Sequence, residues 1–131
     1  MNHLINNCAN LLYEIREKNP LIHNITNYVT ANDCANAVLA IGASPIMADD
    51  AAEVEEIVSI SSALVINIGT LNQRTIASMI IAGKKANELN IPVVLDPVGA
   101  GASTLRNKTT QEIFSQVKID VIRGNLSEIS F

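Results

Sequence analysis

The chain has 131 residues and a net charge of −4, and its length fits one domain spanning 1–131. It has no basic patch to neutralise a phosphate backbone, and only 3% aromatic residues to stack bases, so we expect no nucleic-acid partner. No apolar run reaches the roughly 18 residues of a membrane helix, and the N-terminal stretch lacks the pattern of a signal peptide. We therefore expect a cytoplasmic protein without a membrane partner.

Apolar residues at helical spacing from Leu4 to Ile15 predict a first helix, which ends before Asn19-Pro20. Residues 21–29 are predicted as a short extended piece and a loop. Residues 30–42 follow as a small-residue helix closed by Gly42, and 44–48 as a short strand.

Several polar residues of this first half have structural interpretations. Asp50 and Glu53 have the spacing of a capping box, which would open a helix over 51–62 and leave Asp49 solvated. Cys8 and Cys34 lie in helical patterns without a CxxC pair, so buried thiols are expected. A lone histidine such as His23 is more often a satisfied structural group than a ligand or base.

Beyond residue 62, strands alternate with helices: strands over 63–70, 91–97 and 120–125, helices over 72–90 and 109–117, and the start of another helix at 126. The order αα-β-α-β-α-β-α-β predicts an α/β fold with a parallel sheet and right-handed crossovers. The strands are continuous Val, Ile and Leu runs, which favours a sheet covered by helices on both faces.

Ligands of open α/β sheets bind beyond the carboxyl ends of the strands, where this chain is polar or glycine-rich. The stretches are "SPIMADD", "NIGT", "DPVGAGAST" and "RGNLSE". Asp96 either reaches a magnesium ion, directly or through water, or ends its strand in a turn. Gly99 and Gly101 either offer N–H groups to an anion or supply a turn with positive φ.

Other residues at these strand ends also allow two interpretations. Arg123 suits a phosphate, because its guanidinium is planar and always charged, but a surface ion pair is the usual role of such a residue. Glu128, three residues after Asn125, either organises magnesium-bound water or compensates a helix N-terminus. Met47 suits a small aromatic ligand or ordinary core. Gly69 presents backbone to a ligand or makes a tight turn.

Five motifs, in one order and register, resemble those of the hydroxyethylthiazole kinases, which belong to the ribokinase-like superfamily of vitamin kinases. They are "PLIHNITNYV", "ASPIMA", "ALVINIGTL", "IPVVLDPVGAGA" and "VIRGNLSEI". The resemblance extends from about residue 10 and implies a ribokinase-like α/β fold, incomplete in this chain. It also implies transfer of the γ-phosphate of ATP to the hydroxyl of 4-methyl-5-(2-hydroxyethyl)thiazole, in thiamine salvage, by a homotrimer.

The resemblance also implies roles for single residues. The thiazole would be bordered by Asn27, Val29, Met47 and Gly69. Arg123 would contact the ATP phosphates. Magnesium and its waters would be organised by Asp96 and Glu128, with Asn125.

The family's chain continues well past residue 131. The resemblance places the glycine-rich anion hole, the catalytic acid or cysteine and most of the nucleotide pocket in that second half, so we expect no catalytic residue within 1–131. The chain is then the N-terminal part of a working kinase, or a non-catalytic fragment that at most binds thiazole. A dinucleotide-binding enzyme of the same fold class is disfavoured, because Thr104 occupies the third glycine position of the fingerprint.

Overall fold

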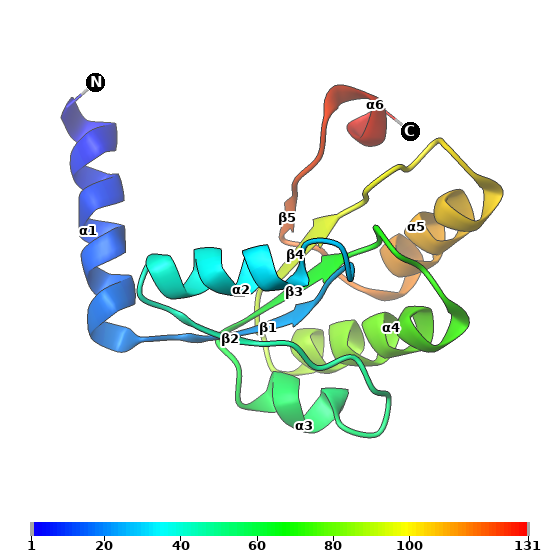
Figure 1. Cartoon of the computed structure of the whole chain (residues 1–131), viewed down its shortest axis with the longest axis horizontal. Coiled ribbons are helices and arrows are strands. Elements are labelled where there is room, and N and C mark those ends of the chain that lie inside the picture. Colours follow the sequence, from blue (N-terminus) through cyan, green and yellow to red (C-terminus); the bar gives the residue numbers. More distant parts are fainter. Residues whose placement is uncertain (1, 131) are drawn as a thin grey trace.

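A computed structural model describes residues 2–130, in which helices and strands alternate along the chain (Figure 1). The helices are α1 (Asn2–Lys18), α2 (Ala31–Ala40), α3 (Val54–Ser59), α4 (Gln73–Glu88), α5 (Thr104–Gln116) and α6 (Leu126–Ile129). The strands are β1 (Leu21–Ile25), β2 (Ser44–Ile46), β3 (Ala63–Asn67), β4 (Val93–Asp96) and β5 (Val121–Ile122). The helix predicted from 126 onward is the short α6, and residue 131 lies outside the described range.

The described strands form one parallel sheet in the order β2-β1-β3-β4-β5. This confirms the predicted α/β class and parallel pairing. The predicted element order is wrong in counting no strand within residues 21–29, because the extended piece there is β1, which pairs with β2 on one side and with β3 on the other. His23 and Asn24 interrupt its apolar run, which made it look unlike a strand, yet both side chains are buried.

The helices lie on both faces of the sheet, but unequally. β1 connects outward to β2, whereas all later connections run in the opposite direction, toward β5. Right-handed crossovers therefore place α2 on one face and α3, α4 and α5 on the other. Figure 1 shows α2 across the sheet from α3 and α4, and α1 projecting away from the body of the molecule.

The hydrophobic core fills the space between the sheet and helices α3, α4 and α5. Its fully or nearly fully buried members are Ile25, Val54, Val58, Leu64, Ile66, Met79, Ala82, Val93, Leu95 and Ile113. On the opposite face Val65 and Val94 are only half-buried, and α2 has no buried residue. The predicted cover of helices on both faces is confirmed, although the face toward α2 is less deeply buried than the other.

A side-chain cap marks the start of α5, whereas α3 begins without one. α5 starts directly after Ser103, whose hydroxyl accepts the N–H of the third helical residue at 3.3 Å, so the helix begins five residues before the predicted start at 109. The capping box predicted at Asp50 is wrong, because α3 begins only at Val54. Asp50 Oδ1 instead accepts the N–H of Ala52 at 2.9 Å and shapes the preceding turn.

The two cysteines differ in exposure. Cys8 is exposed on the projecting α1 and Cys34 is partly buried in α2, both as free thiols, so the prediction of a buried thiol is wrong for Cys8. No helix in the described range 2–130 is long and apolar enough to cross a membrane.

Candidate functional site

A chain of hydrogen bonds crosses the carboxyl ends of four neighbouring strands. Asn27, after β1, donates from Nδ2 to Oδ1 of Asn67 at 3.0 Å. Asn67 ends β3 and donates from its own Nδ2 to Oδ2 of Asp96, at the end of β4, at 3.1 Å. Arg123, after β5, donates to the same Asp96 oxygen at 3.0 Å. The strand order reverses between β1 and β3, so this network lies where α/β sheets bind ligands.

Asn67 is the central link of this network, and sequence reasoning missed it. Its Oδ1 also accepts the N–H of Gly69 at 2.9 Å, so its amide oxygen and amide nitrogen both have defined partners. An asparagine that ends an otherwise apolar strand was the available signal. It joins the Asn27 side of the crevice to the Asp96 side.

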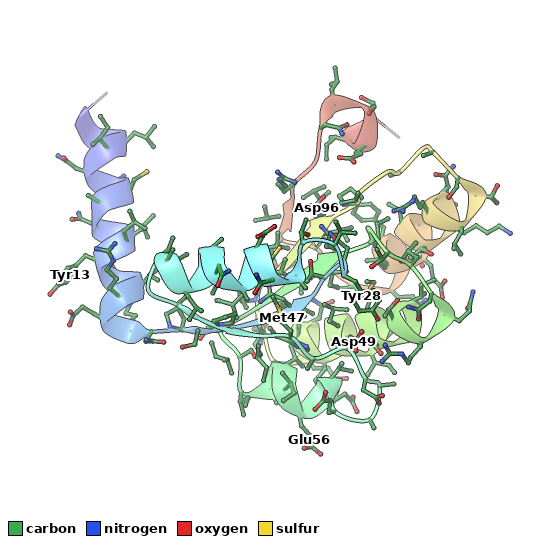
Figure 2. All side chains as sticks on the ribbon, in the orientation of Figure 1. Tyr13, Tyr28, Met47, Asp49, Glu56 and Asp96 are labelled. Carbon is green, nitrogen blue, oxygen red and sulfur yellow. The ribbon has the colours of Figure 1, made fainter. Side chains whose placement is uncertain are left out.

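One carboxylate oxygen of Asp96 accepts two hydrogen bonds, and the other accepts none from the described residues (Asp96 is labelled in Figure 2). The side chain is 15% exposed, and Oδ2 receives both Asn67 and Arg123. Oδ1 is buried and has no hydrogen-bond partner within the described part of the chain. A buried carboxylate oxygen without a partner is costly, so this atom is suited to a donor or cation supplied by a ligand.

Glu128 forms the capping box of α6 and also binds the glycine loop. Its Oε2 accepts the N–H of Asn125 at 2.9 Å and its Oε1 accepts the N–H of Gly99 at 2.8 Å. The bonds from Gly99 and then Asn125, with the charge of Arg123, hold the pKa of Glu128 below its usual value. Within residues 2–130 no group of three or more His, Cys, Asp or Glu side chains is arranged to hold a metal ion. No hydrogen bond links Glu128 to Asp96 among the described residues. Arg123 bonds to Asp96 and acts on Glu128 through its charge.

The glycine loop after β4 satisfies its own N–H groups. Gly99 and Gly101 both have positive φ, at 71° and 90°, which confirms the turn interpretation. Gly99 N–H donates to Glu128, and Gly101 N–H donates to Asn107 Oδ1 at 2.8 Å. The expectation that these two N–H groups are available to an anion is wrong, because side-chain oxygens of this chain already accept them.

Arg106, in the first turn of α5, fastens the glycine loop to the loop after β3. Its Nη1 donates to the carbonyl oxygens of Ile68 at 2.7 Å and Val98 at 2.6 Å, and its Nη2 donates to that of Gly69 at 2.8 Å. Sequence reasoning missed this residue as well. The bonds hold together two loops that both reach the crevice.

Of the four residues expected beside the thiazole, Asn27 and Gly69 lie together. A Cβ atom on Gly69 would come within 2.8 Å of Asn27 Cβ and 2.9 Å of Asn67 Oδ1, so only glycine fits there. Asn27 is 8% exposed, and its Oδ1 accepts both the N–H and the hydroxyl of Thr30 at 3.0 Å. Val29 is 82% exposed and does not join this cluster.

Met47, the fourth of these residues, is 39% exposed and lines a separate small cavity. The cavity measures about 140 Å³, and its walls are Asn24, Thr26, Tyr28, Ala31, Met47 and Asp49. It combines apolar surface from Met47 and Ala31 with amide and hydroxyl groups. Small-molecule sites commonly have this mixture.

Two lining residues of that cavity, Tyr28 and Asp49, belong with Arg74 to a cluster that sequence reasoning did not find, the Tyr28–Asp49–Arg74 cluster. Arg74 Nη1 and Nη2 donate to the two carboxylate oxygens of Asp49, each at 3.1 Å, and the Tyr28 hydroxyl donates to Asp49 at 3.0 Å. The Asp49 carboxylate raises the pKa of Arg74. The expectation that Asp49 is solvated is wrong, because Arg74 and Tyr28 both bind its carboxylate. Arg74 lies 25 residues away in sequence, so no local pattern reveals the contact.

His23 is buried, but the prediction of a satisfied structural group is confirmed for only one of its two ring nitrogens. Its side chain is 0% exposed, and Nε2 lies 2.8 Å from the carbonyl oxygen of Ala48, to which it donates as the Nε2–H tautomer. Nδ1 is buried and has no partner among the described residues. Burial holds the pKa of His23 below its ordinary value of 6.5, despite opposing effects of Ala48 and Glu53.

This burial predicts a loss of stability in mild acid. Because the folded state binds a proton on His23 less readily than the unfolded state does, the free energy of unfolding should fall as pH drops below about 6.5. Urea unfolding at several pH values between 7.5 and 5 measures this slope. His23→Gln removes the titrating group and should flatten it, so an unchanged slope in His23→Gln would assign the pH dependence to other groups.

The five-stranded parallel sheet and the polar crevice at its switch point are those of a partial ribokinase-like α/β domain. A model of the hydroxyethylthiazole kinase family matches residues 12–131. The chain therefore belongs to the hydroxyethylthiazole kinase family.

Curated relatives carry the same family name. The hydroxyethylthiazole kinase of Clostridium beijerinckii is 72% identical over 123 residues, which cover 94% of this chain and 45% of the relative. That of Ruminiclostridium cellulolyticum is 73% identical over 121 residues, covering 92% of this chain and 44% of the relative. The chain thus spans less than half the length of the curated relatives it matches.

Solved structures agree on the fold. A hydroxyethylthiazole kinase protein from Pyrococcus horikoshii OT3 superposes with a TM-score of 0.88 at 52% identity, covering 91% of this chain and 46% of that one. The receiver domain of a Methanoculleus marisnigri response regulator superposes with a TM-score of 0.51 at 13% identity, which is a likeness of fold alone.

Proposed function

We propose that this chain forms the N-terminal part of a kinase that phosphorylates the hydroxyl of 4-methyl-5-(2-hydroxyethyl)thiazole with ATP, in thiamine salvage. The observation that carries the proposal is the free Oδ1 of Asp96, buried next to Arg123 at the switch-point crevice. Membership of the kinase family supports the reaction type. Phosphoryl transfer relies on positioning and charge neutralisation, and a carboxylate beside an arginine provides groups for both.

On the phosphate side, Asp96 would hold Mg²⁺ directly or through water, and Arg123 would contact the ATP phosphates. The side chain of Arg123 is 77% exposed, so it can turn from Asp96 to a phosphate at little cost in burial. Mg²⁺ would neutralise charge that develops on the transferred phosphoryl group. Glu128 and Asn125 would act on the waters of the ion, and Glu128 meanwhile fixes α6 to the glycine loop.

On the substrate side, Asn27, Gly69, Met47 and Val29 would border the thiazole. Asn27 and Gly69 supply a tightly packed polar wall, and the cavity beside Met47 supplies soft apolar surface. Val29 is exposed, which suits a residue that meets a ligand or a second subunit. A cytoplasmic homotrimer, with thiazole sites near the subunit boundaries, completes this proposal.

The second candidate function is a non-catalytic fragment that at most binds the thiazole. No general base beside the substrate hydroxyl is apparent among residues 2–130, and the curated relatives are about twice as long. The dinucleotide-binding alternative loses support, because the N–H groups of Gly99 and Gly101 are already bonded within the chain.

A turnover assay separates the first two candidates. We expect the 131-residue chain alone to form no thiazole phosphate from ATP and Mg²⁺, because the base is supplied by residues beyond this stretch. Mass spectrometry of the product, with the full-length Clostridium beijerinckii relative as positive control, makes the measurement. Product from the 131-residue chain above a no-protein control would contradict the expectation.

Thermal shift then tests binding. The thiazole should raise the melting temperature of the chain, because a ligand of the folded state stabilises it. NAD should leave the temperature unchanged. A shift with NAD and none with the thiazole would remove the kinase proposal.

A further inference from the structure

The loop that carries Met47 is held at two points. Met47 is the first residue after β2, and the next two residues are both bound by side chains from other elements. On the inner side, His23 of β1 binds the carbonyl oxygen of Ala48 at 2.8 Å. On the outer side, Arg74 of α4 binds Asp49. The position of Met47 therefore depends on contacts of its neighbours, since its own side chain is partly exposed.

The contact on the outer side, between Arg74 and Asp49, consists of several hydrogen bonds. Arg74 binds Asp49 through both carboxylate oxygens at 3.1 Å and through the backbone carbonyl oxygen at 3.4 Å. Arg74 Nη2 also donates to the Tyr28 hydroxyl at 3.1 Å, and that hydroxyl donates to Asp49 at 3.0 Å. The cluster thus ties the loops after β1 and β2 to the first turn of α4. Figure 2 shows Tyr28, Met47 and Asp49 close together in this region.

Two members of the cluster also line the cavity beside Met47. Tyr28 and Asp49 form part of its lining, together with Met47 and Ala31. The volume of about 140 Å³ leaves room for a small ring only. A shift of the loop would change both the distance between Met47 and Tyr28 and the size of the opening.

We propose that Arg74, acting through Asp49 and Tyr28, is a positioning residue that holds Met47 at the cavity wall and so sets the largest ring substituent the cavity admits. The inference rests on the proposed function for the identity of the ring. The positioning itself rests on the contacts alone. A planar guanidinium that binds a carboxylate in a fork has a defined orientation, which a lysine would lack.

The first experiment observes Met47 directly. Selective ¹³C labelling of methionine methyl groups gives separate signals for Met47 and for the core residue Met79, which is 2% exposed. In Arg74→Leu, which removes the guanidinium without adding a labelled methyl group, we expect the Met47 signal to move toward its random-coil position and to sharpen, with Met79 unchanged. Tyr28→Phe, which removes one hydroxyl from the cluster, should give a smaller shift in the same direction.

A matched control is available on the same helix. Lys85 pairs with Glu88 at 3.2 Å on α4 and does not line the cavity, so Lys85→Leu removes one exposed ion pair without touching the cluster. It should leave the Met47 signal unchanged. If Arg74→Leu, Arg74→Lys and Lys85→Leu all leave that signal where it is in the parent chain, the positioning role is overturned.

The second experiment measures selectivity by calorimetry. The probes are 4-methyl-5-(2-hydroxyethyl)thiazole and its 4-propyl homologue. The parent chain should bind the homologue about tenfold more weakly or worse, since added methylenes must fit a closed wall. In Arg74→Met that ratio should fall to about threefold or less, while affinity for the methyl compound drops by about threefold.

The outcomes separate the two proposals. An unchanged ratio in Arg74→Met, when the parent chain binds the methyl compound, would overturn the role of the cluster in selectivity. A parent chain that binds neither thiazole would count against the proposed function, and the Met47 signal would still decide the positioning role.

Discussion

Replacing Asp96 by asparagine in a full-length kinase that carries this site is expected to lower kcat by about 100-fold or more, with little change in thiazole affinity. The amide keeps the shape of the side chain and can still meet Asn67 and Arg123. It removes the negative charge and the free carboxylate oxygen, which is buried and unpartnered in the present structure. A cation would then bind weakly where the phosphoryl group is transferred, whereas the Asn27 and Met47 side of the crevice would be unaltered.

Steady-state kinetics at several Mg²⁺ concentrations, with calorimetric binding of the thiazole, makes this measurement. Glu56→Gln is a suitable control, because Glu56 is an exposed acid of α3 that lies far from Asp96 (Figure 2). It should leave kcat within about twofold, as surface substitutions usually do. An unchanged kcat in Asp96→Asn at saturating Mg²⁺ would exclude Asp96 from the metal role.

Arg106→Met is expected to lower the free energy of unfolding by about 2–4 kcal/mol. The guanidinium donates to three carbonyl oxygens, those of Ile68, Gly69 and Val98, at distances from 2.6 to 2.8 Å. Methionine would fill similar space and leave these acceptors without their donor. The loops after β3 and β4 would also lose the bond that joins them, so ligand binding at the crevice should weaken together with stability.

Urea unfolding of the 131-residue chain measures this effect. Lys108→Met makes a similar change of charge on an exposed residue of the same helix and should shift stability by less than about 0.5 kcal/mol. Arg106→Lys should fall between the two, because an ammonium group cannot span three carbonyls in this planar arrangement. If Arg106→Met and Lys108→Met unfold at the same urea concentration, the carbonyl bonds of Arg106 add nothing measurable.

Much of the fold was predictable because its apolar periodicity is strong. The strands that became β3 and β4 are continuous aliphatic runs, and α4 has a clear amphipathic pattern between them. β1 was not recognised as a sheet strand, since His23 and Asn24 are polar and polar residues are unusual in a buried central strand. Only the structure shows that His23 donates to the carbonyl oxygen of Ala48 and that Asn24 donates to that of Ile22 at 2.9 Å. Tertiary contacts, rather than the local sequence, therefore make β1 a strand of the sheet.

The position of the candidate site was predictable from the sequence, but the hydrogen bonds that connect its residues were not. The rule that ligands bind at strand carboxyl ends singled out Asp96 and Arg123, and the structure brings them together at 3.0 Å. The links through Asn67, Arg74 and Arg106 join residues 25 to 46 positions apart, or bind backbone carbonyls, and neither kind of contact leaves a pattern in sequence. For the same reason, the sequence did not reveal that the N–H groups of Gly99 and Gly101 are already hydrogen-bonded within the chain.

The one-sided core has a consequence for the order in which a longer relative acquires its structure. All the core contacts between the sheet and α3, α4 and α5 lie within the stretch that corresponds to this chain. A ribosome adds about 5–20 residues per second from the N-terminus, so this stretch emerges before the rest. Its core contacts can therefore all form during synthesis, before the remaining residues of such a relative have been made.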